Sequence, residues 1–392
     1  MKVRASGFGQ ISGRAIAAKR ATQNAGARRA RGALLCEVWE IRTVSTSESK
    51  RSQTLALIDD PVFLEHHAPA GHPERAERLH AARAAIAGAD MDLRRLDLAT
   101  RSATMDELAR VHSEPYLRRL GQLAGHSGSF DDDTFYSECS IAAAHAAAGA
   151  AVVMTEALLA RQAGFGLALV RPPGHHARPD GAMGFCLINN VAVAAAHARA
   201  RGVERVAIVD FDVHHGNGTQ EMFYADPSVL FVSLHQSPLY PGTGAATENG
   251  VGDGRGYTVN VPLAAGAGDV AYGAAIERIV APVLEAYRPG LLLFSAGFDA
   301  HIRDPLAQME LSDEGFRALI RRVLAAIAPE VPVGLTLEGG YDLLGLGSSL
   351  RAALEGLGEG PTTETPRGRL WQAHERDLAA AAAVAAEIWK LS

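Results

Sequence analysis

The chain has 392 residues, of which 47% are hydrophobic and 21% charged, and its net charge is −6. These values are typical of a folded globular protein and exclude a chain that is mainly disordered or fibrous. The three cysteines form no CxxC pair, which excludes a disulfide framework and a cysteine zinc knuckle and predicts a reducing, cytoplasmic location. They are Cys36, Cys139 and Cys186.

The first 53 residues differ in composition from the rest of the chain. They hold eleven Lys/Arg and three Asp/Glu, a net charge of +8, whereas the remainder holds 27 and 41, a net charge of −14. We expect a basic, disordered N-terminal extension over residues 1–53, because few strong apolar residues are available there to build a core. A weak contact with nucleic acid is one use for such a segment, and a start codon assigned too far upstream is the alternative explanation.

From about Thr54 onward, strand-like apolar segments alternate with Ala-rich segments of helical length. Strands are expected at 164–170, 205–209, 291–294 and 333–337. Helices are expected at 72–86, 141–159 and 191–201, the first with His72 and Arg75 in packing and capping roles. This alternation predicts a single α/β domain built on a parallel sheet.

The end of the chain contributes a linker and one further helix. Residues 358–368 are rich in Gly, Pro and Thr, and an Ala-rich helix follows them. We therefore expect a catalytic domain over 54–357 and a linker with a C-terminal helix, packed on that domain, over 358–392. The apolar run 378–388 is too short to cross a bilayer, so no membrane partner is expected.

Reactive side chains follow each of the four predicted strands. Ligands of open parallel sheets bind beyond the carboxyl ends of the strands, so these side chains are expected to converge. Asp212 and His214 follow the second strand and Asp299 follows the third. Together they predict a three-ligand catalytic metal centre with positions left for water and substrate. A structural cluster satisfied by backbone amides is the alternative.

The tandem histidines after the first strand supply a general base and a second imidazole. Asp210 and Asn217 are their expected partners, where a carboxylate favours a protonated ring and an amide favours a neutral one. Tyr341 follows the flexible Gly339–Gly340 pair and is expected to place its hydroxyl against a developing oxyanion. The two histidines are His175 and His176.

Two aromatic residues are candidates for the walls of a narrow substrate channel. They are Phe185, which follows Gly184, and Tyr240, which precedes Pro241. Aromatic walls suit the aliphatic stem of a lysine side chain. Packing of Phe185 in the core is the alternative interpretation.

Five linked motifs closely resemble those of the histone deacetylase superfamily, which includes bacterial deacetylase-like amidohydrolases, acetoin-utilisation proteins and acetylpolyamine amidohydrolases. The resemblance covers about 54–357, in the family's order. It implies an arginase/deacetylase fold, in which helices flank a parallel eight-stranded sheet. The motifs are RPPGHHA (171–177), GFCLINN (184–190), DFDVHHGNGTQ (210–220), SAGFDAHIRDPL (295–306) and EGGY (338–341).

The resemblance also implies the roles of individual residues. Zinc is expected on Asp212, His214 and Asp299. His176 corresponds to the general base and acid, His175 to its electrostatic partner, and Tyr341 to the hydroxyl that polarises the carbonyl. Potassium is expected beside the zinc loop, and a second monovalent site near Phe223, Asp226 and Val229. The matching potassium positions are Asp210, Asp212, His214, Ser233 and Leu234.

Two positions refine the resemblance. Asn217 stands where one branch of the family has Asp, so the chain resembles the class II type. Leu306 resembles the lysine-deacetylating members, since the polyamine-specific branch has Glu there, and it is assigned to the channel with Gly184 and Gly339.

The predicted function is zinc-dependent removal of acetyl or related acyl groups from lysine side chains of proteins or peptides. Deacetylation of acetylpolyamines or other small amides is the nearest alternative. A two-manganese ureohydrolase is disfavoured because Asp299 is followed by Ala300–His301 rather than by a second aspartate. A non-catalytic metal-binding or acyl-binding module is the remaining alternative. The sequence leaves homo-oligomerisation open.

Overall fold

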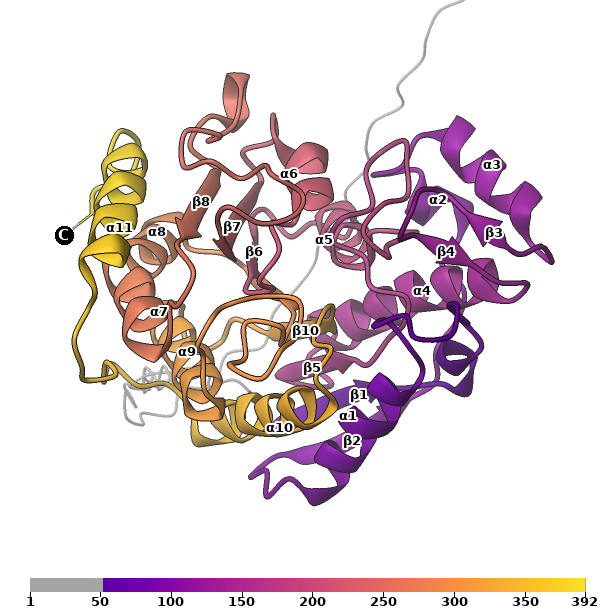
Figure 1. The fold of residues 1–392 in the computed structure, drawn as a ribbon, viewed down its shortest axis with the longest axis horizontal. Helices are drawn as coiled ribbons and strands as arrows, with labels where there is room; N and C mark the ends of the chain where they lie inside the picture. Colours follow the sequence, from indigo (N-terminus) through magenta and orange to yellow (C-terminus); the bar gives the residue numbers. More distant parts are fainter. Residues whose placement is uncertain (1–51, 392) are drawn as a thin grey trace, which may run out of the picture. The chain divides into compact units, whose positions relative to one another are not determined.

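The computed structural model describes residues 52–391, so the extension predicted over 1–53 lies almost entirely outside them. The described chain holds an eight-stranded sheet in which every pairing is parallel (Figure 1). This architecture confirms the expected arginase/deacetylase fold. In sheet order the strands are β2 (Arg94–Leu98), β1 (Thr54–Ile58), β5 (Phe165–Ala168), β10 (Val333–Leu337), β9 (Leu291–Ala296), β6 (Val206–Asp210), β7 (Val229–Gln236) and β8 (Thr258–Leu263).

The strands form where short runs of Val, Leu, Ile, Phe and Ala are bounded by polar turns. Every residue of β1, β5, β6, β7, β9 and β10 is buried, as expected for parallel strands covered on both faces. The edge strand β2 is mostly exposed and carries two arginines. Charged residues on an edge strand discourage pairing with another chain.

Helices cover both faces of this sheet. On one side, α4 and α5 contact each other, α4 also contacts β1, β5 and β10, and α5 contacts β6 and β9. On the other side, α10 lies between α1 and α9 (Figure 1). The α-helices are α1 (Glu77–Gly88), α2 (Met105–Leu108), α3 (Glu114–Leu123), α4 (Ser140–Leu159), α5 (Asn190–Ala200), α6 (Asn217–Phe223), α7 (Asp269–Ala275), α8 (Ala281–Tyr287), α9 (Asp313–Ala325), α10 (Leu343–Glu359) and α11 (Gln372–Ala385).

Smaller elements connect these layers. A π-helical turn, η3 (Ile276–Val280), joins α7 to α8, and the 3-10 turns are η1 (Pro61–Leu64) and η2 (Gly252–Gly254). Strands β3 (Gly128–Ser129) and β4 (Phe135–Tyr136) form a separate antiparallel pair. At the C-terminus, α11 contacts the edge strand β8.

The helix α4 is long and apolar enough to cross a membrane by length and composition, but 78% of its apolar window is buried inside the protein. Its contacts with α5 and three strands identify it as a core helix.

One helix differs from its prediction. The helix expected at 72–86 begins at Glu77, and Arg75 is exposed rather than capping it. His72 packs, as expected, against the rings of Phe135 and Phe185, with centroid distances of 5.5 and 4.6 Å. Pro73 and the buried side chain of Glu74 hold the preceding segment in an irregular path, which the helical periodicity of the sequence did not reveal.

The four strands that precede the reactive motifs are neighbours in the sheet, in the order β5, β10, β9, β6. They come from distant parts of the chain, and β10, the last in sequence, lies between β5 and β9. Because all four are parallel, their carboxyl ends meet at one edge, where the site is built.

Candidate active site

Asp212, His214 and Asp299 lie together beyond the adjacent strands β6 and β9. Their candidate ligand atoms all lie within 4.8 Å of one another. Nδ1 of His214 is 3.1 Å from Oδ1 of Asp212 and 3.1 Å from Oδ2 of Asp299. Both carboxylates are fully buried and the imidazole nearly so. We call these three residues the metal-ligand group.

The electrostatics of the metal-ligand group favour a cation between the carboxylates. Burial, together with the charge of Asp212, raises the pKa of Asp299 to about 7. Burial lowers the pKa of His214, but hydrogen bonds to the two carboxylates outweigh it and raise that pKa to about 10. Two carboxylates and one imidazole are donors that zinc accepts, so the residues present fit a divalent ion of this kind.

Backbone amides fix the orientation of both carboxylates. Oδ1 of Asp299 accepts from the Val213 N–H at 2.8 Å, and Oδ2 of Asp212 accepts from the Gly339 N–H at 2.8 Å. A Cβ at Gly339 would lie 2.1 Å from Oδ2 of Asp299, so only glycine fits there. Gly339, predicted as a channel residue, therefore packs directly against the metal-ligand group.

His175 pairs with a carboxylate. Its Nδ1 lies 3.0 Å from Oδ2 of Asp210, and both side chains are buried. Burial lowers the pKa of His175, but the carboxylates of Asp212 and Asp210 outweigh it and raise the pKa to about 10. This ring is therefore expected to stay protonated at neutral pH.

His176 pairs with an amide and has the opposite tendency. Its Nδ1 lies 2.8 Å from the side-chain oxygen of Asn217, so Nδ1 carries the proton and Nε2 keeps its lone pair. Burial lowers the pKa of His176 well below its ordinary value, and the positive charges of His175 and His214 lower it further. A neutral ring beside a protonated one separates the acid and base roles of the pair.

Tyr341 lies on the far side of the group, next to two charged residues. Its backbone N–H donates to Oδ2 of Asp304 at 2.6 Å, and the guanidinium of Arg78 lies 5.0 Å from its ring centroid. Burial raises the pKa of the Tyr341 hydroxyl well above its ordinary value, so the hydroxyl remains a proton donor.

The aromatic candidates approach this site from two sides. The ring of Phe185 is 5.8 Å from that of Tyr341, and the ring of Tyr240 is 5.2 Å from that of His176, both edge to face. Phe185 has φ +68°, a conformation that L residues rarely adopt and that often marks a functional site. A Cβ at Gly184 would lie 2.5 Å from the ring of His176, so the backbone of this predicted channel residue lies directly against the His176 side chain.

The remaining predicted residues are two potassium candidates, one channel candidate and three candidates for a second monovalent site. Ser233 on β7 is the strand-pairing partner of Asp210 on β6, and the neighbouring Leu234 is fully buried. Both residues therefore lie beside the loop that carries Asp212 and His214. Leu306 is half-buried, and its N–H donates to Asp304, which also holds Tyr341. The second monovalent positions lie where α6 turns into β7, at the opposite edge of the sheet: Phe223, Asp226 and Val229.

A buried ion cluster behind Tyr341 was not identified from the sequence. Arg171 donates to both carboxylate oxygens of Glu74, at 2.5 and 2.7 Å, and Arg78 donates to Oε1 at 3.1 Å. Nε of Arg78 also donates to the carbonyl of Gly340 at 2.6 Å, next to Tyr341. The separation of Glu74 and Arg78 by four residues in the sequence was the available signal. We call Glu74, Arg78, Arg171 and the adjacent His66 the arginine cluster.

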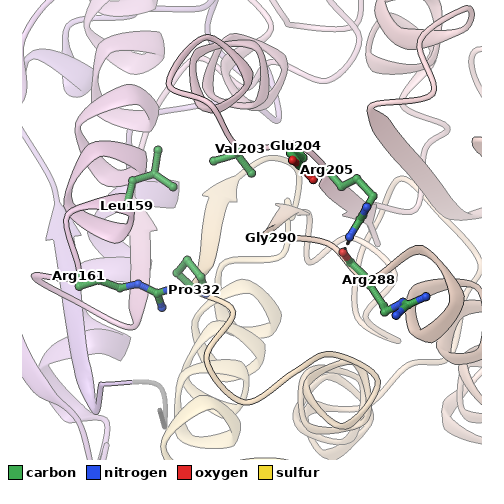
Figure 2. A pocket seen from close by; sticks show the side chains of 8 residues that line it. All are labelled: Leu159, Arg161, Val203, Glu204, Arg205, Arg288, Gly290 and Pro332. Atoms are coloured by element: carbon green, nitrogen blue, oxygen red, sulfur yellow. Dashed lines mark hydrogen bonds between the residues drawn. The ribbon is translucent and has the colours of Figure 1, made fainter. Parts of the chain in front are cut away.

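A surface cavity of about 350 Å³ lies at the other edge of the sheet, where β6, β9 and β10 begin (Figure 2). Residues that precede these strands line it, including Arg205 and Pro332, and none of the predicted site residues does. The cavity is therefore separate from the catalytic edge.

The parallel sheet and the site at its carboxyl edge define an α/β protein of the arginase/deacetylase fold. Residues 72–357 match the model of the histone deacetylase domain. The chain belongs to the histone deacetylase family.

Individual relatives agree with this assignment. A protein of Archaeoglobus fulgidus named probable deacetylase is 40% identical over 72% of this chain and 80% of its own length. The histone deacetylase-like amidohydrolase of Pseudomonas aeruginosa is 42% identical over 70% of this chain and 73% of its own length. The crystal structure of the HDA15 HD domain matches with a TM-score of 0.78 and 37% identity, over 86% of this chain and 95% of that one. These similarities support a hydrolase that acts on amide bonds as a deacetylase.

Proposed function

We propose that the protein is a zinc-dependent deacylase that removes acetyl or a related acyl group from lysine side chains of peptides or proteins. The observation that carries the proposal is the proximity of the metal-ligand group to two histidines with different partners, His175 beside a carboxylate and His176 beside an amide. The metal-ligand group offers a site for a cation, and the histidine pair offers a general base next to that site.

Zinc held by Asp212, His214 and Asp299 would polarise the substrate carbonyl and make water a stronger nucleophile. Potassium beside it, near Asp210, Ser233 and Leu234, remains a prediction from the family resemblance.

The histidine pair moves the protons of the reaction. Nε2 of neutral His176 accepts a proton from the attacking water as the new C–O bond forms. The same nitrogen then donates that proton to the leaving amine when the C–N bond breaks, which yields a carboxylate and a free amine. The protonated His175 supplies a fixed positive charge beside these steps, held in place by Asp210.

Tyr341 acts on the other side of the carbonyl. Its un-ionised hydroxyl donates a hydrogen bond to the oxygen that gains negative charge during attack. The backbone bond to Asp304 and the packing against Phe185 limit its movement.

The two predicted channel residues support the proposed substrate class. Phe185 and Tyr240 offer apolar ring faces that suit a methylene chain leading to an amide, which describes the acyl-lysine side chain. A small acylated amine would fill the same channel, so the choice between the two is left to measurement. Cytoplasmic location and the absence of a membrane partner also remain predictions.

The test is a substrate panel on zinc-loaded protein. We expect kcat/KM to be higher for an acetyl-lysine peptide than for acetylputrescine. Tyr341→Phe should lower kcat on the peptide by about 10²- to 10³-fold, the usual effect of removing one oxyanion donor, while the zinc content stays at one per chain.

A matched control is Tyr287→Phe, which removes a buried hydroxyl that bonds Pro227, distant from the catalytic edge. Its kcat should stay within about twofold of wild type, since nothing at the site changes. Normal turnover by Tyr341→Phe would refute the assigned mechanism, and a preference for acetylputrescine would replace the substrate class.

A further inference from the structure

Glu338 occupies an unusual place at the carboxyl end of β10. Its side chain is fully buried, and its Oε2 accepts from the N–H of Gly174 at 2.6 Å and from the N–H of His175 at 3.1 Å. These two amides belong to the loop that carries the histidine pair. Glu338 itself begins the segment that ends in Tyr341, so one side chain joins the two catalytic loops.

The backbone of Glu338 is anchored as well. Arg78 donates through Nη2 to the carbonyl of Glu338 at 2.5 Å and through Nε to that of Gly340 at 2.6 Å. The position of Glu338 is thus fixed from the arginine cluster. Its carboxylate accepts hydrogen bonds from the loop that carries His175 and His176, so the position of Glu338 determines the position of that loop.

The carboxylate is held without an arginine or lysine partner in the described part of the chain. Oε1 is buried and makes no hydrogen bond there, whereas both oxygens of Glu74 in the arginine cluster accept from Arg171. Burial raises the pKa of Glu338 to about 7, which the positive charge of His175 and the two amides oppose. A buried carboxylate so weakly compensated is costly, and such groups concentrate at functional sites.

Other residues also hold the loop that carries His175 and His176. The side-chain amide of Asn189 donates to the carbonyls of His175 and Ala177, at 3.4 and 3.3 Å, whereas Glu338 accepts from N–H groups of the loop. A Cβ at Gly174 would lie 2.5 Å from the backbone nitrogen of Asn190, so the loop is pressed against the start of α5 on one side. Asn190 also bonds the carbonyl of Pro172 at 3.1 Å. Glu338 bonds the loop at its catalytic end.

We propose that Glu338 is a positioning residue, which sets the placement of the histidine pair relative to Tyr341 by bonding the backbone of Gly174 and His175. The proposal rests on the function given above. A displacement of about 1 Å in a catalytic group can cost about 100-fold in rate. The effect is expected in kcat rather than KM, because the side chain of Glu338 is fully buried and bonds only the loop backbone.

The experiment compares three variants. Glu338→Ala removes the acceptor, Glu338→Gln keeps one acceptor oxygen without the charge, and Thr336→Val is the control. Thr336 is fully buried on the same strand, and its hydroxyl has no hydrogen-bond partner in the described residues. Each variant is characterised by amide hydrogen exchange over residues 169–178, by zinc content, and by kcat and KM on an acetyl-lysine peptide.

In Glu338→Ala, we expect the Gly174 and His175 amides to exchange at least about tenfold faster and kcat to fall about 10- to 100-fold, with KM within about twofold and zinc retained. Glu338→Gln should restore slow exchange and most of kcat. Thr336→Val should match wild type in all readouts.

Two results would overturn the inference: unchanged exchange at these amides in Glu338→Ala, or an equal loss of kcat in Glu338→Gln and Glu338→Ala. The exchange measurement does not depend on turnover. If wild type hydrolyses no acyl-lysine, the proposed function fails, while the exchange data still decide whether Glu338 holds the loop.

Discussion

Two groups of buried charged residues lie near the carboxyl ends of the strands, and they differ in how their charges are neutralised. In the arginine cluster, Glu74 is paired with Arg171 and Arg78, and its pKa is held well below the ordinary value, although burial opposes this. In the metal-ligand group, two carboxylates share one imidazole. In the arginine cluster, side chains of the protein neutralise the charge of Glu74. In the metal-ligand group, the charges of the two carboxylates are neutralised only when a metal ion or a proton binds.

This difference in charge neutralisation distinguishes buried charges with a structural role from buried charges with a functional role. A buried carboxylate that is fully paired holds segments together, and removing it leaves uncompensated arginines. A buried carboxylate that lacks a counter-charge lowers stability unless a cation or a proton binds, so such groups are candidates for functional roles. Substitutions in the two groups should therefore have opposite consequences.

The largest effect is expected from Asp299→Ala. Loss of one ligand should abolish stoichiometric zinc binding and lower turnover by at least about 10³-fold, about 4 kcal/mol in transition-state stabilisation. The unfolding free energy of the metal-free protein should not fall, because burial and the charge of Asp212 raise the pKa of Asp299 to about 7, so its ionised form is unfavourable in the folded protein. Metal analysis and urea unfolding in chelator measure both quantities. A clear loss of metal-free stability would contradict the comparison.

Glu74→Ala should show the reverse pattern. Two buried guanidinium groups lose their counter-charge, so the unfolding free energy should fall by about 3–5 kcal/mol. Zinc binding by the folded fraction should persist. Glu65→Ala is a suitable control, since that side chain is 57% exposed, and its effect should stay within about 0.5 kcal/mol. Equal unfolding curves for the two variants would show that the arginine cluster is not structural.

A smaller effect concerns His112, a buried ring without a counter-charge. Its Nδ1 bonds the carbonyl of Arg178 and its Nε2 accepts from the N–H of Asn189. Burial lowers the pKa of His112 from 6.5 to about 4. Between these values the unfolded chain binds the proton and the folded protein does not, so stability falls as the pH is lowered through this window.

For His112 the expected loss between pH 7 and pH 5 is about 2 kcal/mol. Urea unfolding of wild type and His112→Gln at both pH values isolates this contribution, since all other residues are the same in the two proteins. The pH-dependent loss should be smaller in the variant by about that amount. Identical losses would mean that His112 is not kept neutral by burial.

Local patterns in the sequence predicted a large part of this structure. The strand at 333–337 has the predicted bounds, the strand predicted at 205–209 lies one residue later, and the strand predicted at 291–294 begins as predicted and ends two residues later. These segments are short, apolar and bounded by polar turns, which is a signal contained in neighbouring residues. The convergence of Asp212, His214 and Asp299 followed from strand polarity.

Contacts that join distant segments were not predictable in this way. Arg78 bonds the carbonyl of Gly340, 262 positions away, and Arg171 bonds Glu74, 97 positions away. Nothing near an arginine in the sequence indicates that it will be fully buried. The role of Glu338 was missed for the same reason, because its partners belong to a loop over 160 residues earlier.

The central position of β10 also constrains how the protein is made. This strand pairs Val333 with Phe165 and with Leu292, so it enters the middle of the sheet after its neighbours have been synthesised. A nascent chain that ends before residue 339 lacks the amide that orients Asp212, as well as Tyr341. Metal uptake and activity should therefore appear only late in translation, after residues 339–341 have left the ribosome.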